Sequence, residues 1–354
     1  MITILDRYIA RTLLSTVTLT LSILVGLSAL IKFVEQLRKL GEGDYNMTVA
    51  ALYVLLSLPR EIEQFFPMAT LLGALVGMGV LASSSELVVM QASGMSRWNI
   101  INSAMRASAI MIIVIMAVGE FITPISEAKA KQIRTEALSG GSLFASDELT
   151  WAKDGSDFVS IGQVITQNLS ADVTVYRFAD NLLLEQMIYA KQAKYNQDDG
   201  WQLQDVTVTS YRPEHIDVVS LDNAEWRSSL TPDKLGIVAV KPEALSIRGL
   251  NEYISYLDNN RQDSSRYELA FWRKLFQPLS VAVMVLMALS FIFGPLRSVS
   301  MGARVIMGVL VGFSFFISNE VFGPLSLVYQ LPPLLGAVLP SVLFAGVAAF
   351  LLRR

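Results

Sequence analysis

Long apolar stretches and polar stretches alternate along this chain in a simple order. Six apolar stretches are long enough to cross a hydrocarbon core about 30 Å thick, for which a helix needs about 20 residues. They centre on residues 13–31, 67–81, 100–122, 275–293, 305–322 and 334–352. A long polar block separates the third from the fourth. The pattern predicts three membrane helices, a soluble domain and three more membrane helices.

The polar block itself has the pattern of a β domain. Short runs rich in Val, Ile, Thr and Tyr are separated by polar or glycine-containing turns, at residues 158–165, 172–178, 186–195, 201–211 and 216–226. This spacing is typical of an antiparallel sandwich or an open jelly roll. Residues 242–266 are polar and helical in pattern and lead into the fourth apolar stretch.

The predicted fold class is therefore a membrane α-helical protein with six transmembrane helices and a β-jellyroll domain inserted between helices 3 and 4. The predicted parts are residues 1–128 for helices 1–3, residues 129–264 for the β domain and its connecting segment, and residues 265–354 for helices 4–6. The first apolar run is too long for a cleavable signal peptide, and no small-residue cleavage site follows it, so we interpret it as a retained anchor.

Composition narrows the class of protein. Of 354 residues, 53% are hydrophobic and only 17% are charged, whereas soluble domains carry about 25% charged residues. The net charge of −3 excludes a generally basic nucleic-acid binder. There is no Cys and a single His, His215, so neither a thiolate nor a histidine metal site is expected. We expect His215 to be an ordinary strand or turn residue.

The positions of Lys and Arg predict the orientation. If there are six spans, one side of the membrane carries Arg7, Arg11, Arg97, Arg297, Arg304, Arg353 and Arg354. Cytoplasmic loops are enriched in Lys and Arg, so this side is predicted to be cytoplasmic. Both termini then lie inside and the large domain lies outside.

The inner loop between the second and third stretches contains a short semi-apolar segment, residues 84–96. Glu86 and Ser93 alternate with apolar side chains that include Leu87 and Met90, and Gly94 offers a helix stop. One interpretation is a loop helix packed on the spans. The other is a coupling helix that inserts into a cytoplasmic ATPase.

Basic residues also occur where the orientation disfavours them, at the outer ends of the spans. They are Lys32, Arg38, Lys39, Arg60, Arg134, Arg266, Arg273 and Lys274. For a single residue, a local pair such as Lys32 with Glu35, or Arg60 with a glutamate of its own helix, is sufficient. For the group we favour an anionic ligand, because phosphate suits both Lys and Arg.

Two acids, Glu120 and Glu320, lie inside or at the outer ends of the third and fifth stretches. Ionisable groups there are costly and often functional. Proton coupling is one interpretation, but no chain of acids or histidines crosses the membrane. We therefore favour pairing of both acids with the basic residues.

Prolines and glycines interrupt several spans, including Pro59, Pro67, Gly73 and Gly77 in the second. Such residues allow kinks and close helix approach. Helices of this kind can slide or separate, but ordinary tight packing explains the residues equally well. There is no G-x-x-x-x-G-K-[ST] phosphate loop, so the chain itself should not hydrolyse ATP.

Three segments resemble one known family. LDRYI at residues 5–9, SELVVMQASG at 85–94, and FQPLS at 276–280 running to FIFGPLR at 291–297 are similar to the lipopolysaccharide export permease family, LptF/LptG. LTPDKLG at 230–236 and WAKDG at 151–155 look more like the LptG branch. The similarity extends over essentially the whole length.

The resemblance implies an assembly in the bacterial inner membrane. It implies a heterodimer with LptF, a pair of LptB ATPases that bind ATP and Mg in the cytoplasm, and LptC as an inner-membrane partner. The soluble block would be a periplasmic β-jellyroll that helps to carry lipid toward LptC and LptA. No cofactor is expected in this chain.

The resemblance also implies roles for individual residues. The segment with Glu86, Leu87, Met90, Ser93 and Gly94 would contact LptB. The basic positions of the outer cavity would face lipid A phosphates or inner-core sugars, and aromatic positions would contact acyl chains. These positions are Lys32, Arg38, Lys39, Arg60, Arg134, Phe65, Phe66 and Phe322.

The sequence thus predicts a permease subunit, not an enzyme, that extracts lipopolysaccharide from the outer leaflet of the inner membrane with energy from a separate ATPase. The alternatives are a lipoprotein-releasing or other ABC-type permease, and a non-transporting mechanical or signalling subunit. The outer basic residues argue against both alternatives. A proton-driven carrier is disfavoured by the lack of a buried acid relay.

Overall fold

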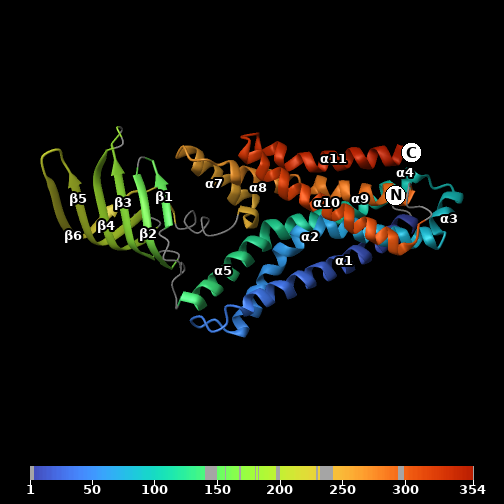
Figure 1. The fold of residues 1–354 in the computed structure, drawn as a ribbon, viewed down its shortest axis with the longest axis horizontal. Coiled ribbons are helices and arrows are strands. Elements are labelled where there is room, and N and C mark those ends of the chain that lie inside the picture. Colours follow the sequence, from blue (N-terminus) through green and yellow to red (C-terminus); the bar gives the residue numbers. More distant parts are fainter. Residues whose placement is uncertain are drawn as a thin grey trace.

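A bundle of long helices stands beside a separate antiparallel sheet in the computed structural model of the chain (Figure 1). The structure describes residues 4–139, 150–155, 157–166, 169–179, 181, 183–196, 200–228, 230–231, 242–293 and 299–353. Arg297 and the Gly294-Pro295 pair lie outside these residues.

The first half of the bundle runs from α1 to α5. The elements are α1 (Ile4–Leu37), α2 (Met47–Ser83), α3 (Glu86–Ala92), α4 (Arg97–Ala117), the π-helix η1 (Val118–Ile122) and α5 (Thr123–Ser139). The helix of the third predicted span thus continues past residue 128, where we placed the domain boundary. Asn46 caps α2 by accepting the Thr48 and Val49 amides, each at 3.0 Å, as short polar residues do at helix N-termini.

The second half follows the sheet. The elements are the 3₁₀ turn η2 (Pro242–Ala244), α7 (Ile247–Asn259), α8 (Ser265–Leu275), α9 (Gln277–Phe293), α10 (Met301–Val328) and α11 (Pro333–Arg353). Among the described residues, five helices are long and apolar enough to span a membrane, and α8 with α9 forms a sixth candidate bent by 49°. This agrees with the six predicted spans if the bent pair counts as one. Gly323 and Pro324 lie inside α10, so this helix extends beyond the apolar stretch centred on residues 305–322.

Helix α2 is at the centre of the bundle, and it packs against α1, α5, α9 and α10. Its glycines let α1 approach closely. A Cβ at Gly73 would lie 2.5 Å from Val17 Cα, and one at Gly77 would lie 2.6 Å from the Thr16 hydroxyl. Both distances are far inside van der Waals contact. Tight packing is therefore the observed use of these two glycines.

The sheet contains six described strands in sequence order, β1 to β6, all antiparallel. Their bounds are β1 (Thr150–Asp154), β2 (Asp157–Thr166), β3 (Leu169–Phe178), β4 (Leu184–Asn196), β5 (Gly200–Tyr211) and β6 (Ile216–Trp226). Five strands match the predicted runs, and β1 was not predicted. A jelly roll needs Greek-key connections. The described strands form a meander without them, so the jelly roll stays a prediction for the complete domain.

One face of the sheet is covered by α7. Val173 and Val175 of β3 are almost fully buried and form one cluster with Leu203 of β5 and with Tyr253 and Tyr256 of α7. The Tyr256 hydroxyl donates to the Lys153 carbonyl of β1 at 2.6 Å. Burial raises the pKa of Tyr256 to about 12. Helix α7 therefore belongs to the core of the sheet domain as well as to its attachment.

The three tryptophans of the sheet differ in burial. Trp201 and Trp226 are buried in the sheet cluster, and the Trp201 indole donates to the Leu230 carbonyl at 2.6 Å. Trp151 instead is 53% exposed and stacks on Tyr176. His215 lies in the β5–β6 hairpin, 3.3 Å from Asp217. It is a turn residue, as predicted.

Both chain ends lie at one end of the bundle, and the sheet lies at the other (Figure 1). Helix α3 is at the same end as the termini. This arrangement follows from an odd number of passes, three before the sheet and three after it when α8 and α9 count as one. It agrees with the predicted placement of the termini and the inner loop on one side of the membrane.

Candidate functional site

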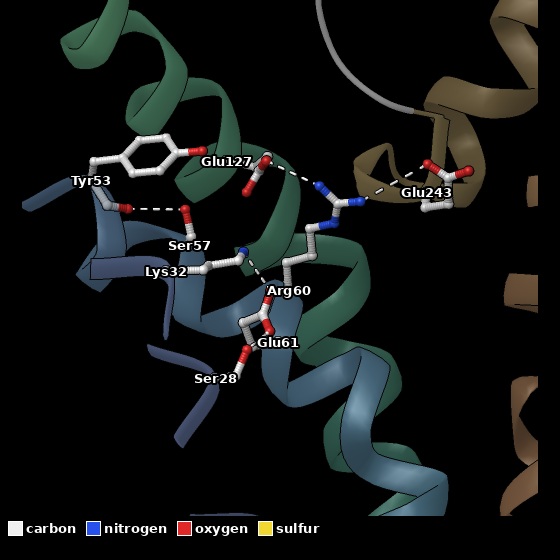
Figure 2. Close-up of polar contacts among 8 residues, drawn as sticks. All are labelled: Ser28, Lys32, Tyr53, Ser57, Arg60, Glu61, Glu127 and Glu243. Carbon is white, nitrogen blue, oxygen red and sulfur yellow. Dashed lines mark hydrogen bonds and ion pairs between the residues drawn. The ribbon is translucent and has the colours of Figure 1, made fainter. Parts of the chain in front are cut away.

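The sheet-proximal ends of α1 and α2 are joined by a cross-helix ion pair (Figure 2). Lys32 Nζ lies 2.5 Å from a carboxylate oxygen of Glu61. The Ser28 hydroxyl donates to the other oxygen at 2.5 Å. Glu61 is 5% exposed, whereas the Lys32 side chain keeps 28% of its surface exposed. The lysine therefore remains accessible although its charge is balanced.

The preceding residue of α2, Arg60, points to the opposite side. Arg60 lies 3.2 Å from Glu127 of α5 and 4.0 Å from Glu243 of η2 (Figure 2). Glu127 is 4% exposed. Arg60 and Glu61 thus tie α2 to three other elements. The local pairs suggested by spacing, Lys32 with Glu35 and Arg60 with Glu61 or Glu63, are wrong, because these charges pair between helices.

Three further predicted basic residues lie nearby. Arg38 is exposed and Lys39 is half-buried in the turn after α1, and neither makes an ion pair within the described part of the chain. Arg134 of α5 lies over the Tyr53 ring, with 5.1 Å between the guanidinium carbon and the ring centre. We call Lys32, Arg38, Lys39, Arg60 and Arg134 the outer basic set.

The three predicted aromatic contacts differ in their surroundings. Phe66 is 2% exposed and packs with Val17, Met111 and Ile115 in a small core. Phe65 and Phe322 are partly exposed. In this conformation only Phe65 and Phe322 have surface to offer to an acyl chain, because α2 turns Phe66 toward α4.

The inner segment forms the short helix α3, and its two faces differ sharply. Leu87 and Met90 are 4% and 5% exposed and belong to the core of the bundle. Val88 and Val89 are 55% and 66% exposed. A partner that docks here would therefore touch Val88 and Val89, not Leu87 and Met90, because residues three apart share one helix face.

Both ends of α3 are fixed by specific hydrogen bonds. At its start, Glu86 accepts from the Tyr8 hydroxyl at 2.7 Å and from the Ser84 hydroxyl at 2.8 Å. At its end, the Met95 and Gly94 amides donate back to the Met90 and Gln91 carbonyls, each at 3.1 Å. Gly94 has φ +98°, as a Schellman helix end requires, so the predicted helix stop is confirmed.

A polar cavity of about 330 Å³ adjoins the end of α3. Its lining includes Ser93, Gly94, Asn99 and Arg106. The exposed valines and this cavity lie on neighbouring surfaces of the inner loop. Together they offer a partner an apolar contact beside a polar recess.

The predicted acids have their own partners. The Glu120 carboxylate accepts backbone N–H groups of Ile247 at 2.8 Å and of Arg248 at 3.4 Å, so it caps α7 instead of pairing with the outer basic set. Glu320 is exposed on α10, near Arg273, which donates to the Asn319 carbonyl. Within the described ranges, no group of three or more acidic or histidine side chains could hold a metal ion.

Comparison with known proteins identifies the family of this chain. The family described as "Lipopolysaccharide export system permease LptF/LptG" matches residues 7–354. The chain belongs to this family. It is 47% identical over 353 residues to the lipopolysaccharide export system permease protein LptG of Escherichia coli (strain K12), covering 99% of this chain and 98% of that protein. It is 46% identical to LptG of Haemophilus influenzae (strain Rd), covering 100% and 99%.

Within the LptF/LptG fold of this chain, sequence reasoning missed the acids that balance the outer basic set. Glu61 and Glu127 lie in apolar or helical surroundings, where an ionisable residue signals a specific partner. That signal could have marked Glu61, as it marked Glu120. Glu243 carried no such signal, because it lies in the polar segment before α7 and meets Arg60 only through the fold.

Proposed function

We propose that this chain is a permease subunit of an ATP-driven lipopolysaccharide exporter, with LptF as its heterodimer partner. The proposal rests mainly on near full-length identity of 46–47% to proteins named as lipopolysaccharide export permeases. The chain would be an inner-membrane protein with both termini in the cytoplasm and the sheet in the periplasm. It would help to lift lipopolysaccharide from the outer leaflet and pass it to LptC and LptA.

The physical demand of this task is large. Withdrawing a lipid from a bilayer exposes acyl chains at about 0.8 kcal/mol per CH₂, so release without energy input is negligible. The chain needs an apolar surface for the acyl chains and cationic groups for the phosphates. Phe65 and Phe322 supply the first at the outer end of the bundle, and the outer basic set supplies the second.

The acids paired with Lys32 and Arg60 would compete with a lipid head group for these cations. Lys32 and Arg60 are already paired, with Glu61 in one case and with Glu127 and Glu243 in the other. An anionic head group must therefore compete with these carboxylates or join them. Lys32 is the better placed of the two, because it is more exposed than Arg60. Arg38 and Lys39 are free of this competition within the described residues and would make the first contact.

Energy would enter at the opposite end. Helix α3 would dock on an LptB ATPase through Val88 and Val89, with Glu86, Ser93 and Gly94 at its ends. Leu87 and Met90 would transmit the force into the bundle, because they are packed in its core. ATP and Mg would be bound by LptB, and this chain would hold no cofactor.

The heterodimer partner would cover apolar helix surfaces that this chain leaves exposed. On α1, large exposed side chains include Leu19, Ile23, Leu27 and Leu30, at 57–65% exposure. On α10 they include Ile306 and Phe313, at 62% and 54%. Lipid tails and LptF would share these surfaces.

Copurification tests the proposal. The chain, carrying an affinity tag, would be isolated from its native membrane in mild detergent. We expect LptF, LptB and bound lipopolysaccharide to accompany it. Isolation of the chain with neither an ATPase nor lipopolysaccharide would overturn the proposal.

A further inference from the structure

Four irregular backbone features lie close together at the junction of the helix bundle and the sheet domain. They are the π-helix η1 in the third span, Pro67 in α2, the break between α8 and α9, and the segment of residues 242–248 that leads into α7. We call residues 242–248 the connector. Breaks in regular helices are where helices bend, and π-bulges are frequent at functional sites.

Lys274, near the end of α8, lies at the centre of this junction. It is 8% exposed. Its ammonium donates to the Gly119 carbonyl of η1 and to the Leu245 carbonyl of the connector, each at 2.8 Å. Glu63 of α2 lies 3.4 Å away. An ammonium has three donors, and each meets a partner on a different element.

The residues around Lys274 allow η1 and α2 to approach closely enough for the ion pair of Lys274 with Glu63. A Cβ at Gly119 would lie 2.8 Å from the Glu63 carboxylate, so only glycine lets η1 come this near. Pro67 lacks the N–H that would bind the Glu63 carbonyl one turn earlier. The Gln277 side chain donates to that carbonyl at 3.1 Å instead. The proline thus leaves the Glu63 carbonyl free to accept from Gln277, the first residue of α9, and this bond ties α2 to α9.

The next residue of η1 holds the other end of the connector. The Glu120 carboxylate accepts the Ile247 and Arg248 amides. The Ser246 hydroxyl accepts the Gly249 amide at 2.9 Å. The first amides of a helix have no partner within it, and here all three are satisfied. The negative charge also suits the positive end of the helix.

We infer that Lys274, Glu63, Gly119 and Glu120 form a clamp that fixes the connector to the membrane helices and carries their movement to the sheet domain. Every element that joins the clamp is either a helix of the bundle or the connector itself. Helix α7 is packed into the sheet core. A shift of α2 or of the third span therefore moves α7 and the sheet with it.

The positioning role stands on these contacts alone, and its use during transport rests on the proposed function. The sequence grouped Lys274 with the basic residues expected to meet an anion, but its ammonium is buried and bound to two backbone carbonyls. We therefore assign positioning roles to Lys274 and to Glu120, which caps α7. Their loss should leave ATP hydrolysis by the assembled complex in place. It should reduce delivery of lipopolysaccharide, because the sheet would no longer follow the helices.

Distance measurement tests the clamp. The chain has no Cys, so spin labels can be attached through Glu42→Cys, in the turn after α1, and Glu214→Cys, in the β5–β6 hairpin. In the assembled complex we expect one narrow distance distribution. Lys274→Met should replace it by a broad one. Lys129→Met, at an exposed lysine of α5, is the matched control and should leave it narrow.

A milder variant covers the case in which Lys274→Met fails to fold. Glu120→Ala leaves the Lys274–Glu63 pair intact and removes only the cap of α7. We expect about fivefold faster hydrogen exchange in the first turn of α7, since a lost N-cap interaction is worth about 1 kcal/mol. A narrow distribution in Lys274→Met together with unchanged exchange in Glu120→Ala would overturn the clamp. Both measurements need neither lipid nor ATP, so failure of the transport proposal would leave them unaffected.

Discussion

Lys32, at the sheet-proximal end of the bundle, combines two roles that the sequence offered as alternatives. Lys32 makes an ion pair and also keeps exposed surface toward the side where a lipid head group would lie. Pairing with a buried carboxylate holds the lysine in place without hiding it. Its availability to an anion is then set by Glu61.

Changing Glu61 should therefore act oppositely to changing Lys32. Glu61→Gln removes the competing charge, and we expect lipopolysaccharide capture to rise about fivefold, since a partly exposed pair is worth up to about 1 kcal/mol. Lys32→Asp should lower capture. Photocrosslinking of lipopolysaccharide to the outer end of α1 measures both. Normal capture in Lys32→Asp would reduce Lys32 to a structural residue, and Lys129→Asp controls for net charge.

A glycine in the middle of α2 makes a second prediction at this scale. Gly73→Ala would place a Cβ 2.5 Å from the backbone of Val17, so α1 and α2 must separate. We expect a clear loss of thermal stability in detergent, measured as the unfolding temperature. Gly26→Ala is the matched control, because no atom lies within 4 Å of its Cβ position. It should be neutral or stabilising, since Ala favours helix over Gly by about 1 kcal/mol. Equal effects of the two changes would contradict the close approach.

The two faces of helix α3 have different roles, one in packing of the bundle and one in the proposed docking of a partner. Its inward face belongs to the bundle core, and its outward face remains uncovered. The hydrogen bonds at both ends of α3 fix its rotation about its own axis, and so which side chains face the core. A partner could therefore push on the outer face while the inner face passes the load into the bundle core.

Substitutions on the two faces of α3 should affect different properties, ATPase coupling on the outer face and stability on the inner face. Val89→Asp lies on the surface, so stability should change by less than about 0.5 kcal/mol, while ATPase association or coupling should fall. Leu87→Ala should instead cost about 2–5 kcal/mol of stability through the cavity it leaves. Thermal unfolding and ATPase-coupled extraction distinguish the two. Unchanged coupling in a folded Val89→Asp chain would contradict docking through this face.

At the scale of the whole molecule, the positions of the arginines and the order of the helices agree with one predicted orientation across the membrane. The termini and α3 share one end, and the sheet occupies the other. Three of the arginines that set the predicted orientation lie at the helix ends on the first side: Arg7 in the first turn of α1, Arg97 at the start of α4 and Arg353 at the end of α11. Under the proposed function, the end with α3 would receive force from the ATPase and the end with the sheet would handle the lipid.

Labelling can check this orientation, because the natural chain has no thiol. Glu214→Cys, in the sheet, should react with an impermeant maleimide once the outer membrane is made permeable. Arg97→Cys should react only after the inner membrane is opened. The reverse pattern would invert the proposed topology.

The sequence by itself determined the apolar helices of the bundle, five of the strands, the helix stop at Gly94 and the family. Each depends on local periodicity, on a turn residue or on an extended match, all of which are readable along the chain. It did not determine β1, which is short and partly exposed, or the length of the third helix beyond residue 128.

Only the tertiary structure decided which charges meet. Lys32 finds Glu61, Arg60 finds Glu127 and Glu243, and Glu120 finds the start of α7. These pairs join residues far apart in sequence, so no spacing rule predicts them. Burial decided the faces of α3 for the same reason, because Leu87 and Val88 are equally apolar and differ only in what packs against them. The clamp around Lys274 depends on three helices and a connector meeting at one point, and that meeting exists only in the folded chain.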